Sequence, residues 1–487
     1  MAVDMNFRHV IYIQEHPTPI IPLTQITQPT VAFGTAPVHL AANPAGSNTP
    51  ILCSTLAEFV DQFGWSDDFD SYTLCEVAKA HFTLYNVAPV VFVNVLDPIK
   101  HAAQKTVEVE GLSVPITIDK PAIIGSIVIK TGENGEEITL DLGDDYTADH
   151  DSVVVGNTVI TITTAGSAKI VNDKAVVTYR EIDASAVTAS TIIGGVDQMT
   201  GANTGLECLE DVYPKLGVVP GTVIAPKFST DAALALVMAN KCNGINGCFK
   251  AHAVADLPTS TVRKYTDVVA AKTGQNLINS FLTVTWPKVT VGGEQYHLST
   301  QLAALMCTVD AARNDIPYKS PSNEMLTCNG ACLADGTPVY LGKNLANYVN
   351  GQGIVTALNF AGWRSWGNYT SAFPNDTDPI NFISVRRMLD WMNNTLILRF
   401  FSRIDDPMNR VLVDTVIDSV RTWINGLAKQ GAILGGDIAF LSEDNPVSEL
   451  AAGNMLFRMD VGFAVPAQKI QFTLQFNTNY FETLFTA

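Results

Sequence analysis

The residues best suited to catalysis lie where a predicted strand ends. His252 and Asp256 flank the end of the apolar segment 249–254, and enzymes built on parallel sheets place catalytic groups at the carboxyl ends of strands. A nucleophile elbow of the form G-x-S-x-G is missing from the sequence, and the eight histidines are dispersed along it. We therefore interpret His252 and Asp256 as structural residues and expect no enzymatic activity.

The sequence contains neither a nucleotide-binding motif nor an EF-hand calcium-binding motif. The stretch 194–201 reads GGVDQMTG, which lacks both the G-x-G-x-x-G spacing and the lysine of a phosphate-binding loop. Residues 141–151 hold five aspartates, but an EF-hand needs glycine at loop position six and glutamate at twelve, and neither is in register. We expect no cofactor and a solvated acidic loop, with calcium binding at 141–151 left open.

The eight cysteines do not form a zinc signature. A zinc site usually combines paired C-x-x-C units or nearby histidines, and the two close cysteine pairs, at 242/248 and 328/332, have neither. We predict buried, reduced thiols and no metal site. The cysteines are Cys53, Cys75, Cys208, Cys242, Cys248, Cys307, Cys328 and Cys332.

The overall charge and hydropathy exclude several classes of protein. The 487 residues carry a net charge of −18, whereas a protein that coats nucleic acid needs a basic face. The sequence has no run of 18 or more apolar residues, so we predict no membrane insertion. The first 14 residues lack the basic-then-apolar pattern of a signal peptide, which predicts synthesis inside the cell.

Two separated blocks of sequence alternate between strands and helices. In the first block, strands at 30–33 and 89–95 enclose helices that begin near 54 and 73. In the second block, strands at 222–225, 249–254 and 281–286 alternate with helices of 10–15 residues. Such alternation implies crossover connections and a mostly parallel sheet. We expect both blocks to form one α/β domain with a mixed sheet covered on both faces.

The segment 101–190 between these blocks has a different character. Short strands rich in Val, Ile and Thr alternate with turns, and Asn134-Gly135 and Gly156-Asn157 are hairpin signals. We predict an inserted β-sandwich-like domain, which is solvent-facing because it carries 14 acidic and 6 basic residues. A carbohydrate-binding or adhesion module would present aromatic platforms here, and Tyr146 and Tyr179 are the only aromatic residues.

The last third of the chain is the most strongly patterned. A Trp/Arg-rich turn at 362–368 precedes two amphipathic runs, at 379–400 and 409–429, with apolar residues near helical spacing. We interpret Trp363 and Trp366 of the turn as packing residues. The whole chain is thus predicted to be a multidomain α/β protein, α+β overall, with an α+β C-terminal domain.

Both ends of the sequence carry strand-like segments. Near the C-terminus, alternation places Ile470, Phe472, Leu474 and Phe476 on one face of a strand, which could pair within its own sheet or with the sheet edge of another chain. Near the N-terminus, a strand-like tetrapeptide precedes three prolines that keep the chain extended. That segment is either the first strand of the next domain or an arm that pairs with a neighbour. The tetrapeptide is Val10, Ile11, Tyr12 and Ile13.

Several of these segments, in this order, resemble a known family. The C-terminal segments GWRSWGN, INFISVRRMLDWMNNTL and VPAQKIQFTLQF are similar to the C-terminal domain of contractile tail sheath proteins. The stretch GVVPGTVIAPKFS is similar to their central domain, and RHVIYIQEH followed by TVAFGTAP is similar to their N-terminal arm. The resemblance covers nearly the whole chain. Sheath proteins form the outer sleeve of myovirus-type phage tails and of phage-tail-like particles.

The resemblance implies a domain organisation and roles for some residues. Family members carry an outward-projecting β-rich insertion, and terminal arms suit a polymer whose subunits stay linked while they repack. We therefore assign inter-subunit strand pairing to the segments at 10–13 and 470–476. Family members also face the inner tube with the C-terminal domain, which makes Arg386 and Arg387 tube-facing candidates; the alternative is salt bridges within the domain. The expected divisions are an arm at 1–22, a central domain at 23–100 and 191–345, an insertion at 101–190, a C-terminal domain at 346–468 and a terminal strand at 469–487.

The resemblance also implies a structural function. Sheath subunits polymerise as a helical sleeve around an inner tube, and contraction drives the tube through the target envelope without a nucleotide. The implied partners are further copies of the chain, the inner tail tube protein, and baseplate and tail terminator proteins, with no nucleic acid. The implied location is a virion tail, assembled in the bacterial host cytoplasm. A headless tail-like bacteriocin or injection particle, and a β-sandwich-bearing adhesion module, are the alternatives.

Overall fold

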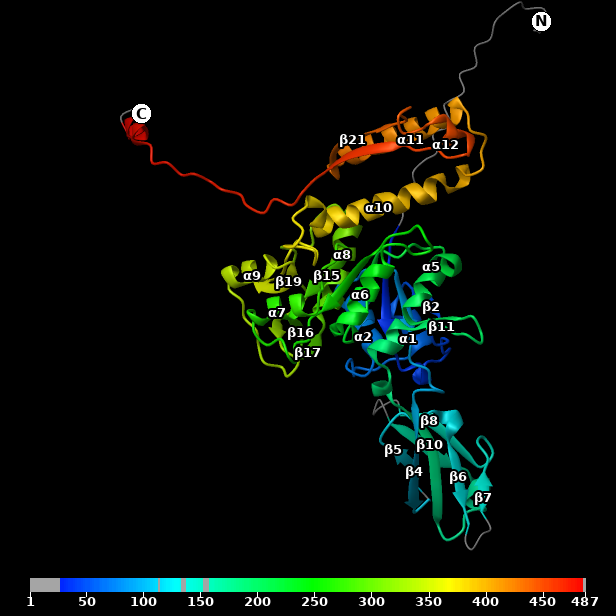
Figure 1. Ribbon diagram of the computed structural model, residues 1–487. Helices are drawn as coiled ribbons and strands as arrows, with labels where there is room; N and C mark the ends of the chain where they lie inside the picture. The colour runs from blue at the N-terminus through cyan, green and yellow to red at the C-terminus, as the bar shows by residue number, and fades with distance from the viewer. Residues whose placement is uncertain (1–26, 113, 133–136, 152–156, 485–487) are drawn as a thin grey trace, which may run out of the picture.

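The computed structural model describes residues 27–112, 114–132, 137–151 and 157–484. It confirms the predicted fold class: a mixed sheet with flanking helices, a β-rich insertion and an α+β C-terminal domain. Figure 1 shows these three parts in a row, with the insertion at one end of the central body and the C-terminal domain at the other. The N-terminal segment predicted to pair with a neighbour, Val10 to Ile13, lies outside the described residues.

An eight-stranded sheet forms the centre of the body, in the order β2-β3-β1-β13-β14-β15-β19-β20. The six inner strands pair in parallel, and the two edge strands, β2 and β20, are antiparallel to their neighbours. The strands are β1 (Thr30–Gly34), β2 (Pro50–Cys53), β3 (Val90–Asn94), β13 (Thr222–Ile224), β14 (His252–Asp256), β15 (Leu282–Thr285), β19 (Ile354–Asn359) and β20 (Trp363–Trp366).

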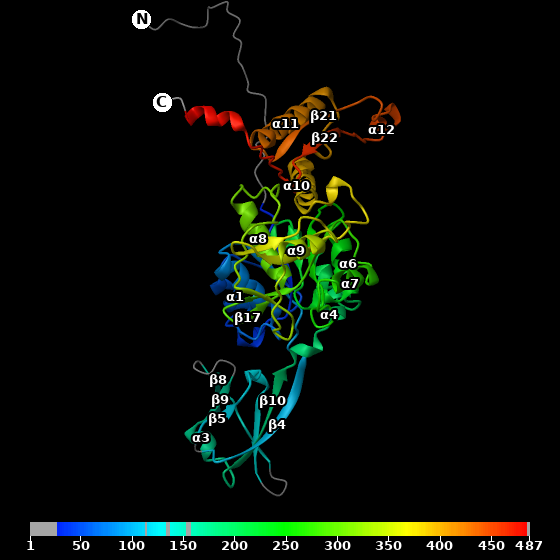
Figure 2. The ribbon, with the colours of Figure 1, turned by 90° about the vertical axis from the view of Figure 1, so that its left-hand side faces the viewer.

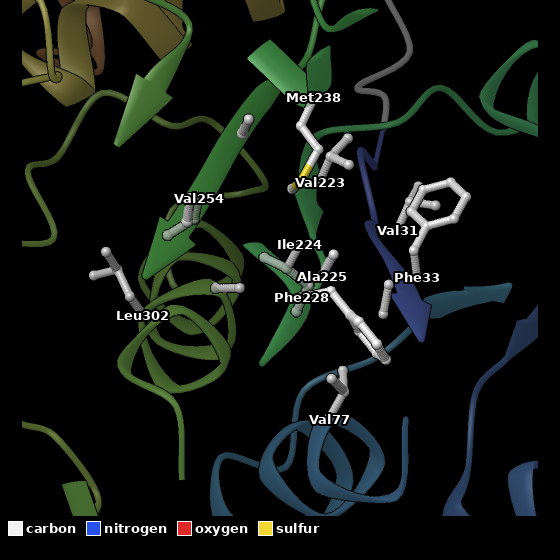
Figure 3. Close-up of a cluster of buried hydrophobic side chains, with 14 of the residues drawn as sticks. Val31, Phe33, Val77, Val223, Ile224, Ala225, Phe228, Met238, Val254 and Leu302 are labelled. Carbon is white, nitrogen blue, oxygen red and sulfur yellow. The ribbon is translucent and has the colours of Figure 1, made fainter. Parts of the chain in front are cut away.

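Helices enclose this sheet and complete its core. Every residue of β1 and β14 is buried, as expected for strands covered on both faces. Figure 3 shows Val31, Val223 and Val254 of the sheet among side chains from the surrounding helices, including Met238 and Leu302. The helices are α1 (Leu56–Phe63), α2 (Thr73–Ala78), α4 (Ala189–Ile193), α5 (Leu209–Leu216), α6 (Ala232–Lys241), α7 (Asp267–Gly274), α8 (Leu298–Ala311) and α9 (Lys343–Asn350).

The central body extends further along the chain than the sequence indicated. The Trp/Arg-rich turn lies in β20, which pairs with β19 in the main sheet, and Trp363 is buried there. The predicted boundary between 345 and 346 is therefore wrong, because the hairpin β19–β20 continues the sheet across it. The C-terminal domain begins near α10 (Ile383–Phe400). Two short sheets also decorate the body: β16 (Lys288–Val291), β17 (Glu294–Tyr296) and β18 (Gly330–Cys332), and β11 (Gly195–Val196) with β12 (Asn203–Thr204).

The β-rich insertion leaves and re-enters the body through two paired strands, β4 and β10 (Figure 2). It contains a four-stranded and a three-stranded sheet around a hydrophobic core of its own. Tyr146 and Tyr179 belong to this core and are 1% and 7% exposed, so neither forms a binding platform. The elements are β4 (Ala102–Glu110), β5 (Ile116–Ile118), β6 (Val128–Thr131), β7 (Ile138–Leu140), β8 (Tyr146–His150), β9 (Thr158–Ile162), α3 (Thr164–Ser167) and β10 (Lys174–Ile182).

The C-terminal domain consists of two long helices and a two-stranded sheet. α11 (Arg410–Lys429) begins where the Asn409 side chain accepts a hydrogen bond from the backbone N–H of Leu412 at 2.9 Å, an N-cap that satisfies a free helix donor. The apolar face of α11 packs against β21 (Ile433–Ala439), which pairs with β22 (Arg458–Phe463). The short helix α12 (Val447–Ala451) lies in the connection between the two strands. Both long helices begin and end within a few residues of the predicted runs.

Candidate subunit interface in the C-terminal domain

The segment after β22 leaves the domain as an extended tail (Figure 1). Gln468 holds the start of the tail against the body: its amide oxygen accepts from the Tyr369 hydroxyl at 3.2 Å, and its amide nitrogen donates to Asn368 at 3.3 Å. Beyond this point the chain remains extended as far as a short 3₁₀ segment at Thr478–Leu484. Within the described residues the predicted strand at 469–476 has no pairing partner, which excludes pairing inside its own sheet.

The tail exposes the four apolar side chains that alternation placed on one face. The exposed fractions are 74% for Ile470, 85% for Phe472, 96% for Leu474 and 78% for Phe476. Burial of one such side chain is worth about 1.5–3 kcal/mol, and a contiguous exposed apolar surface marks an interaction site. The tail therefore has the pattern of a half-buried strand without the surface that would bury it.

The β21–β22 hairpin offers a matching edge. Each of its two strands has one edge without a partner among the described residues, and such an edge can pair with an added strand. On β22, the half-buried side chains of Met459, Val461 and Phe463 pack into the domain core, while the intervening residues are exposed. A strand added beside β22 would extend this apolar face, because side chains alternate between the two faces of a sheet.

Helix α10 fixes the hairpin to the central body, and Arg386 and Arg387 form part of that attachment. The Arg386 guanidinium is ion-paired with Asp390 at 2.5 Å and lies 4.6 Å from the ring centre of Phe281. Arg387 donates to both carboxylate oxygens of Asp310 on α8, at 2.5 and 3.3 Å. Burial raises the pKa of Asp390 to about 6 against the opposing effect of Arg386.

These contacts direct both arginine side chains into the interior of the protein. Arg386 is 5% exposed and Arg387 is 8% exposed, so neither guanidinium is available on the surface of the chain. The geometry favours the salt-bridge alternative over the tube-facing one. One of the two pairs is within α10, and the other joins the C-terminal domain to the body.

A second contact between α10 and the body was not apparent from the sequence. The side-chain amide of Asn394 accepts from the backbone N–H of Lys250 at 2.9 Å and donates to the backbone carbonyl of the same residue at 2.6 Å. Asn394 is fully buried. A buried amide that satisfies both backbone groups of one residue fixes both position and rotation, because each lost bond would leave a buried polar group without a partner.

The two candidate catalytic residues have structural partners. Buried His252 is bonded through Nε2 to the Thr283 hydroxyl at 2.7 Å, and burial together with Arg387 and Arg386 lowers its pKa to about 3. The Asp256 carboxylate accepts from the Thr285 hydroxyl at 2.6 Å and from the backbone N–H of Ser299 at 3.0 Å, near the start of α8. These bonds join neighbouring strands and a helix terminus, which is a structural role.

A comparable buried pair escaped the sequence analysis. The Glu76 carboxylate on α2 accepts from the backbone N–H and from Nδ1 of His297 at 2.6 and 2.8 Å, and both residues are buried. The two residues are 221 positions apart in the chain. Neither their types nor their spacing indicated the contact.

The remaining candidate ligands do not converge. Within the described residues no group of three or more His, Cys, Asp or Glu side chains could hold a metal ion. In the acidic loop, Asp145 is ion-paired with Lys169 at 2.6 Å. All eight cysteines are free, and five are buried, whereas Cys248 is exposed and Cys307 and Cys328 are partly exposed. The prediction of buried thiols is therefore wrong for these three, because an apolar neighbourhood in sequence does not determine burial.

Similarity searches find relatives along the whole length of the chain. No family model matches it. The chain is 28% identical to the tail sheath protein of Burkholderia phage BcepMu, across 98% of both proteins. It is 25% identical to a putative prophage major tail sheath protein of Pseudomonas aeruginosa, across 59% of this chain and 72% of the relative. It is also 23% identical to the tail sheath protein of Escherichia phage P2, across 62% of this chain and 74% of the relative.

Solved structures share the fold. The sheath complex of the extracellular contractile injection system PVC, in its contracted state, matches 97% of this chain and 98% of its own with a TM-score of 0.59 at 14% identity. The anti-feeding prophage baseplate matches 97% of this chain and 99% of its own with a TM-score of 0.54 at 13% identity. None of the described helices is long and apolar enough to cross a membrane. In sequence the chain is thus similar to phage tail sheath proteins over almost its full length, and it shares the fold of a solved contractile sheath.

Proposed function

We propose that this protein is the subunit of a helical sheath that surrounds an inner tail tube and contracts to drive the tube through a target cell envelope. The observation that carries the proposal is the similarity to phage tail sheath proteins across nearly the whole chain, combined with an apolar tail that has no partner in its own subunit. The work of contraction comes from repacking of subunits, so the proposal assigns no enzymatic step and no cofactor.

The proposed partners follow from this role. The main partner is the chain itself, and the others are an inner tube protein, a baseplate and a tail terminator. Two structural relatives carry names that fit this arrangement, one a sheath complex in a contracted state and the other a baseplate. The proposed location is the tail of a phage or of a tail-like particle, assembled in the bacterial host cytoplasm.

Subunits of a contracting polymer must stay connected while they rotate. We assign this connection to residues 469–476, which would add as a strand to the open edge of β22 in another copy. The apolar face of Ile470, Phe472, Leu474 and Phe476 would then continue the face that Met459, Val461 and Phe463 turn toward the core. Main-chain pairing of this kind gives affinity, and it persists through rigid-body rotation because it lies within one sheet.

The N-terminal segment remains assigned to the same task. Val10, Ile11, Tyr12 and Ile13 would supply a second strand to a neighbouring hairpin, whose other open edge belongs to β21. This assignment rests on the sequence alone, because these residues lie outside the described structure. A hairpin with both edges occupied would no longer present an unpaired edge to unrelated chains.

Electron microscopy of the purified protein tests both parts of the proposal. We expect striated hollow cylinders from the full chain, and we expect them to be lost when residues 469–487 are removed. A sharper variant is Thr473→Pro, which removes one backbone donor from the added strand. The matched control Thr473→Val keeps the donor and should assemble, because position 473 faces away from the apolar side of the tail.

The outcomes separate the two parts. If Thr473→Pro and the truncated chain assemble as well as the full chain, the sheath assignment stands and the role of the tail is wrong. If the full chain stays monomeric at high concentration, the sheath assignment itself is overturned.

A further inference from the structure

The C-terminal domain contains an apolar groove that the proposed strand pairing does not explain. The groove has a volume of about 790 Å³ and lies between the end of α10, α11 and the segment 453–459. Sites of about 300–1,000 Å³ are typical of ligand-binding pockets. Its lining includes Leu396, Phe400, Leu412, Val416, Ile438 and Met459.

Exposed apolar side chains continue the groove onto the surface. Phe401 and Ile404 follow α10 directly and are 70% and 63% exposed, and Met408 is 37% exposed. Arg403, Asp405 and Asp406 provide polar groups at the same place. An apolar surface with a polar border is typical of a site that another protein segment covers.

The end of the tail has the complementary character. We call residues 476–484 the tail plug. Tyr480, Phe481 and Leu484 lie on its 3₁₀ segment and are 73%, 54% and 76% exposed. The rings of Phe476 and Phe481 contact each other at 5.9 Å between centres. Figure 1 shows the plug held away from the rest of the protein at the end of the extended tail.

The tail plug of a chain does not fill the groove of the same chain, because the tail leaves the hairpin at the end that is farther from the groove. Phe457, which immediately precedes β22, and Met459, near the start of β22, line the groove. β22 then runs to Phe463, and the tail continues from that far end. The plug and the groove of one subunit are thus separated by the length of the hairpin and of the tail.

We propose that the tail plug of one copy occupies the groove of a second copy. The inference rests on the proposed strand addition and deepens it by giving the added strand a direction. A strand formed by 470–476 and antiparallel to β22 would start beside Phe463 and end beside Arg458. The residues that follow, 478–484, would emerge where the groove begins. A parallel strand on β22 would carry the plug to the opposite end.

The chemistry of the two surfaces suits this contact. Three methionines line the groove, Met408, Met455 and Met459. Thioether side chains adapt to irregular shapes and make favourable contacts with aromatic rings. Binding in the groove would bury the aromatic and aliphatic side chains of the plug. This burial would increase the affinity of the added strand and fix its pairing register with β22.

The first test uses cross-linking between two separately purified variants, both in a Cys248→Ser background that removes the exposed cysteine. One variant carries Met408→Cys in the groove, and the other carries Leu484→Cys in the plug. Since each subunit then has only one of the two introduced thiols, a disulfide between them reports contact between copies. We expect a covalent dimer after mild oxidation of co-assembled cylinders, and markedly less from either variant alone.

The second test measures assembly of the full chain. Phe481→Glu places a charge in the plug and should raise the concentration needed for cylinder formation at least about tenfold, the effect of losing one buried aromatic contact. Thr478→Glu adds the same charge at a polar, exposed position of the same segment and should change that concentration less than about threefold. Both positions are exposed, so the fold of the subunit is expected to survive either change.

The outcomes distinguish this inference from the proposed function. If cylinders form, and neither the cross-link nor the difference between the two glutamate variants appears, the plug inference is overturned while the sheath assignment stands. A cross-link from Met408→Cys to a cysteine introduced at position 13, in place of position 484, would assign the groove to the N-terminal segment and also overturn it. If the unmodified chain forms no cylinders, the proposed function itself is overturned.

Discussion

The central body joins the C-terminal domain through α10 and joins the insertion through β4 and β10, and the two junctions are built differently. At the first junction, two buried side chains of α10 are satisfied across the contact: Arg387 pairs with Asp310, and Asn394 binds both backbone groups of Lys250. Hydrophobic residues of α10 also pack against the core of the body.

The junction with the insertion is lined mostly by polar residues. A pocket of about 610 Å³ lies between the two parts, lined by Trp65 and Tyr72 of the body and by Lys120 and Asn157 of the insertion. The rings of His39 and His150 meet edge to face across the junction, 6.2 Å apart. The insertion has a hydrophobic core of its own, and only Ala102, Ile123 and Ile182 of the insertion pack against the core of the body. The insertion is thus an independently packed unit on a two-strand connection.

This difference indicates which parts move together. Satisfied, buried polar contacts hold a single arrangement, because any displacement would leave groups unpaired in a low-dielectric interior. We infer that α10 and the hairpin move with the central body as one rigid unit, whereas the insertion can change its orientation at little cost. If the tail pairs with a second copy as proposed, force applied to the tail of one subunit would reach the body of that copy through α10.

The largest predicted effect comes from breaking the ion pair between α10 and α8. Arg387→Ala leaves Asp310 buried without its partner, which typically costs about 3–5 kcal/mol of folding free energy. Chemical denaturation followed by tryptophan fluorescence measures the loss. The comparison beside the other junction is Lys120→Ala, which removes the partner of Glu181; both residues belong to the insertion and line the junction pocket. Lys120 is 62% exposed, so we expect a loss of about 0–1 kcal/mol. Equal losses from the two variants would contradict the contrast between the junctions.

A smaller loss is expected from the amide contact at the same junction. Asn394→Ala leaves the backbone N–H and carbonyl of Lys250 without their partners, and an unsatisfied buried polar group costs about 1–3 kcal/mol. Hydrogen exchange provides the specific readout, because protection of the Lys250 amide should fall along with the unfolding free energy. Asn393→Ala serves as the control: Asn393 donates to the carbonyl of exposed Cys248 at 3.2 Å and to the amide oxygen of Asn394 at 3.3 Å. Its removal leaves both bonds between Asn394 and Lys250 in place. A stability loss from Asn393→Ala as large as that from Asn394→Ala would refute the special role of Asn394.

The pH dependence of unfolding tests both junctions, because His39 lies at the junction with the insertion and His252 lies near Arg386 and Arg387 of α10. Burial and His150 lower the pKa of His39 to about 4, and burial with the two arginines lowers that of His252 to about 3. Because both values lie below the usual 6.5, the unfolded chain binds more protons than the folded chain between these limits. Each neutral histidine makes its full contribution to the free energy of unfolding above pH 6.5. That contribution is lost as the pH falls, by about 2 kcal/mol for each histidine at pH 5.

The two histidines should act on different parts of the molecule. His252→Gln should reduce the pH dependence of the unfolding free energy of the body between pH 6.5 and 5. His39→Gln should reduce only the pH dependence of the detachment of the insertion from the body. Limited proteolysis of the connections at 97–101 and 183–188, measured across this pH range, separates the two effects. An unchanged pH dependence in His252→Gln would show that its buried neutral state does not contribute as stated.

The elements of the C-terminal domain were largely predictable because their determinants are local. The spacing of Val413, Val420, Ile424 and Leu427 predicts α11, and Asn409 caps its start. The alternation of Ile470, Phe472, Leu474 and Phe476 predicts a strand, yet the isolated chain has none there. Under the proposed strand addition, this apolar face would be buried by another chain, and the sequence of a single subunit does not identify that partner.

What the sequence could not indicate depends on contacts between distant residues. Arg386 and Arg387 appeared at the flank of a helix, and the partner that buries Arg387 lies 77 residues away. The boundary near 345 was misplaced for a similar reason, because only the pairing of β19 with β15 places the following hairpin in the main sheet. The groove likewise combines α10, α11 and the segment 453–459, so no short stretch of sequence contains it.

The smallest predicted effect is that of removing the insertion altogether. Ala102 and Ile182 are paired neighbours on β4 and β10, about 5 Å apart at Cα, so a short Gly-Ser link can replace the residues between them. Because the core of the insertion is separate, we expect the unfolding free energy of the body to change by less than about 1 kcal/mol, a shift of roughly 2–4 °C in the thermal midpoint. Removal of residues 383–487 provides the contrast, since it uncovers Phe281 and deprives Asp310 and Lys250 of their partners. That variant should be strongly destabilised or insoluble. If the two deletions destabilise the body equally, the insertion is as much a part of the rigid unit as α10, and the proposed freedom of its junction is wrong.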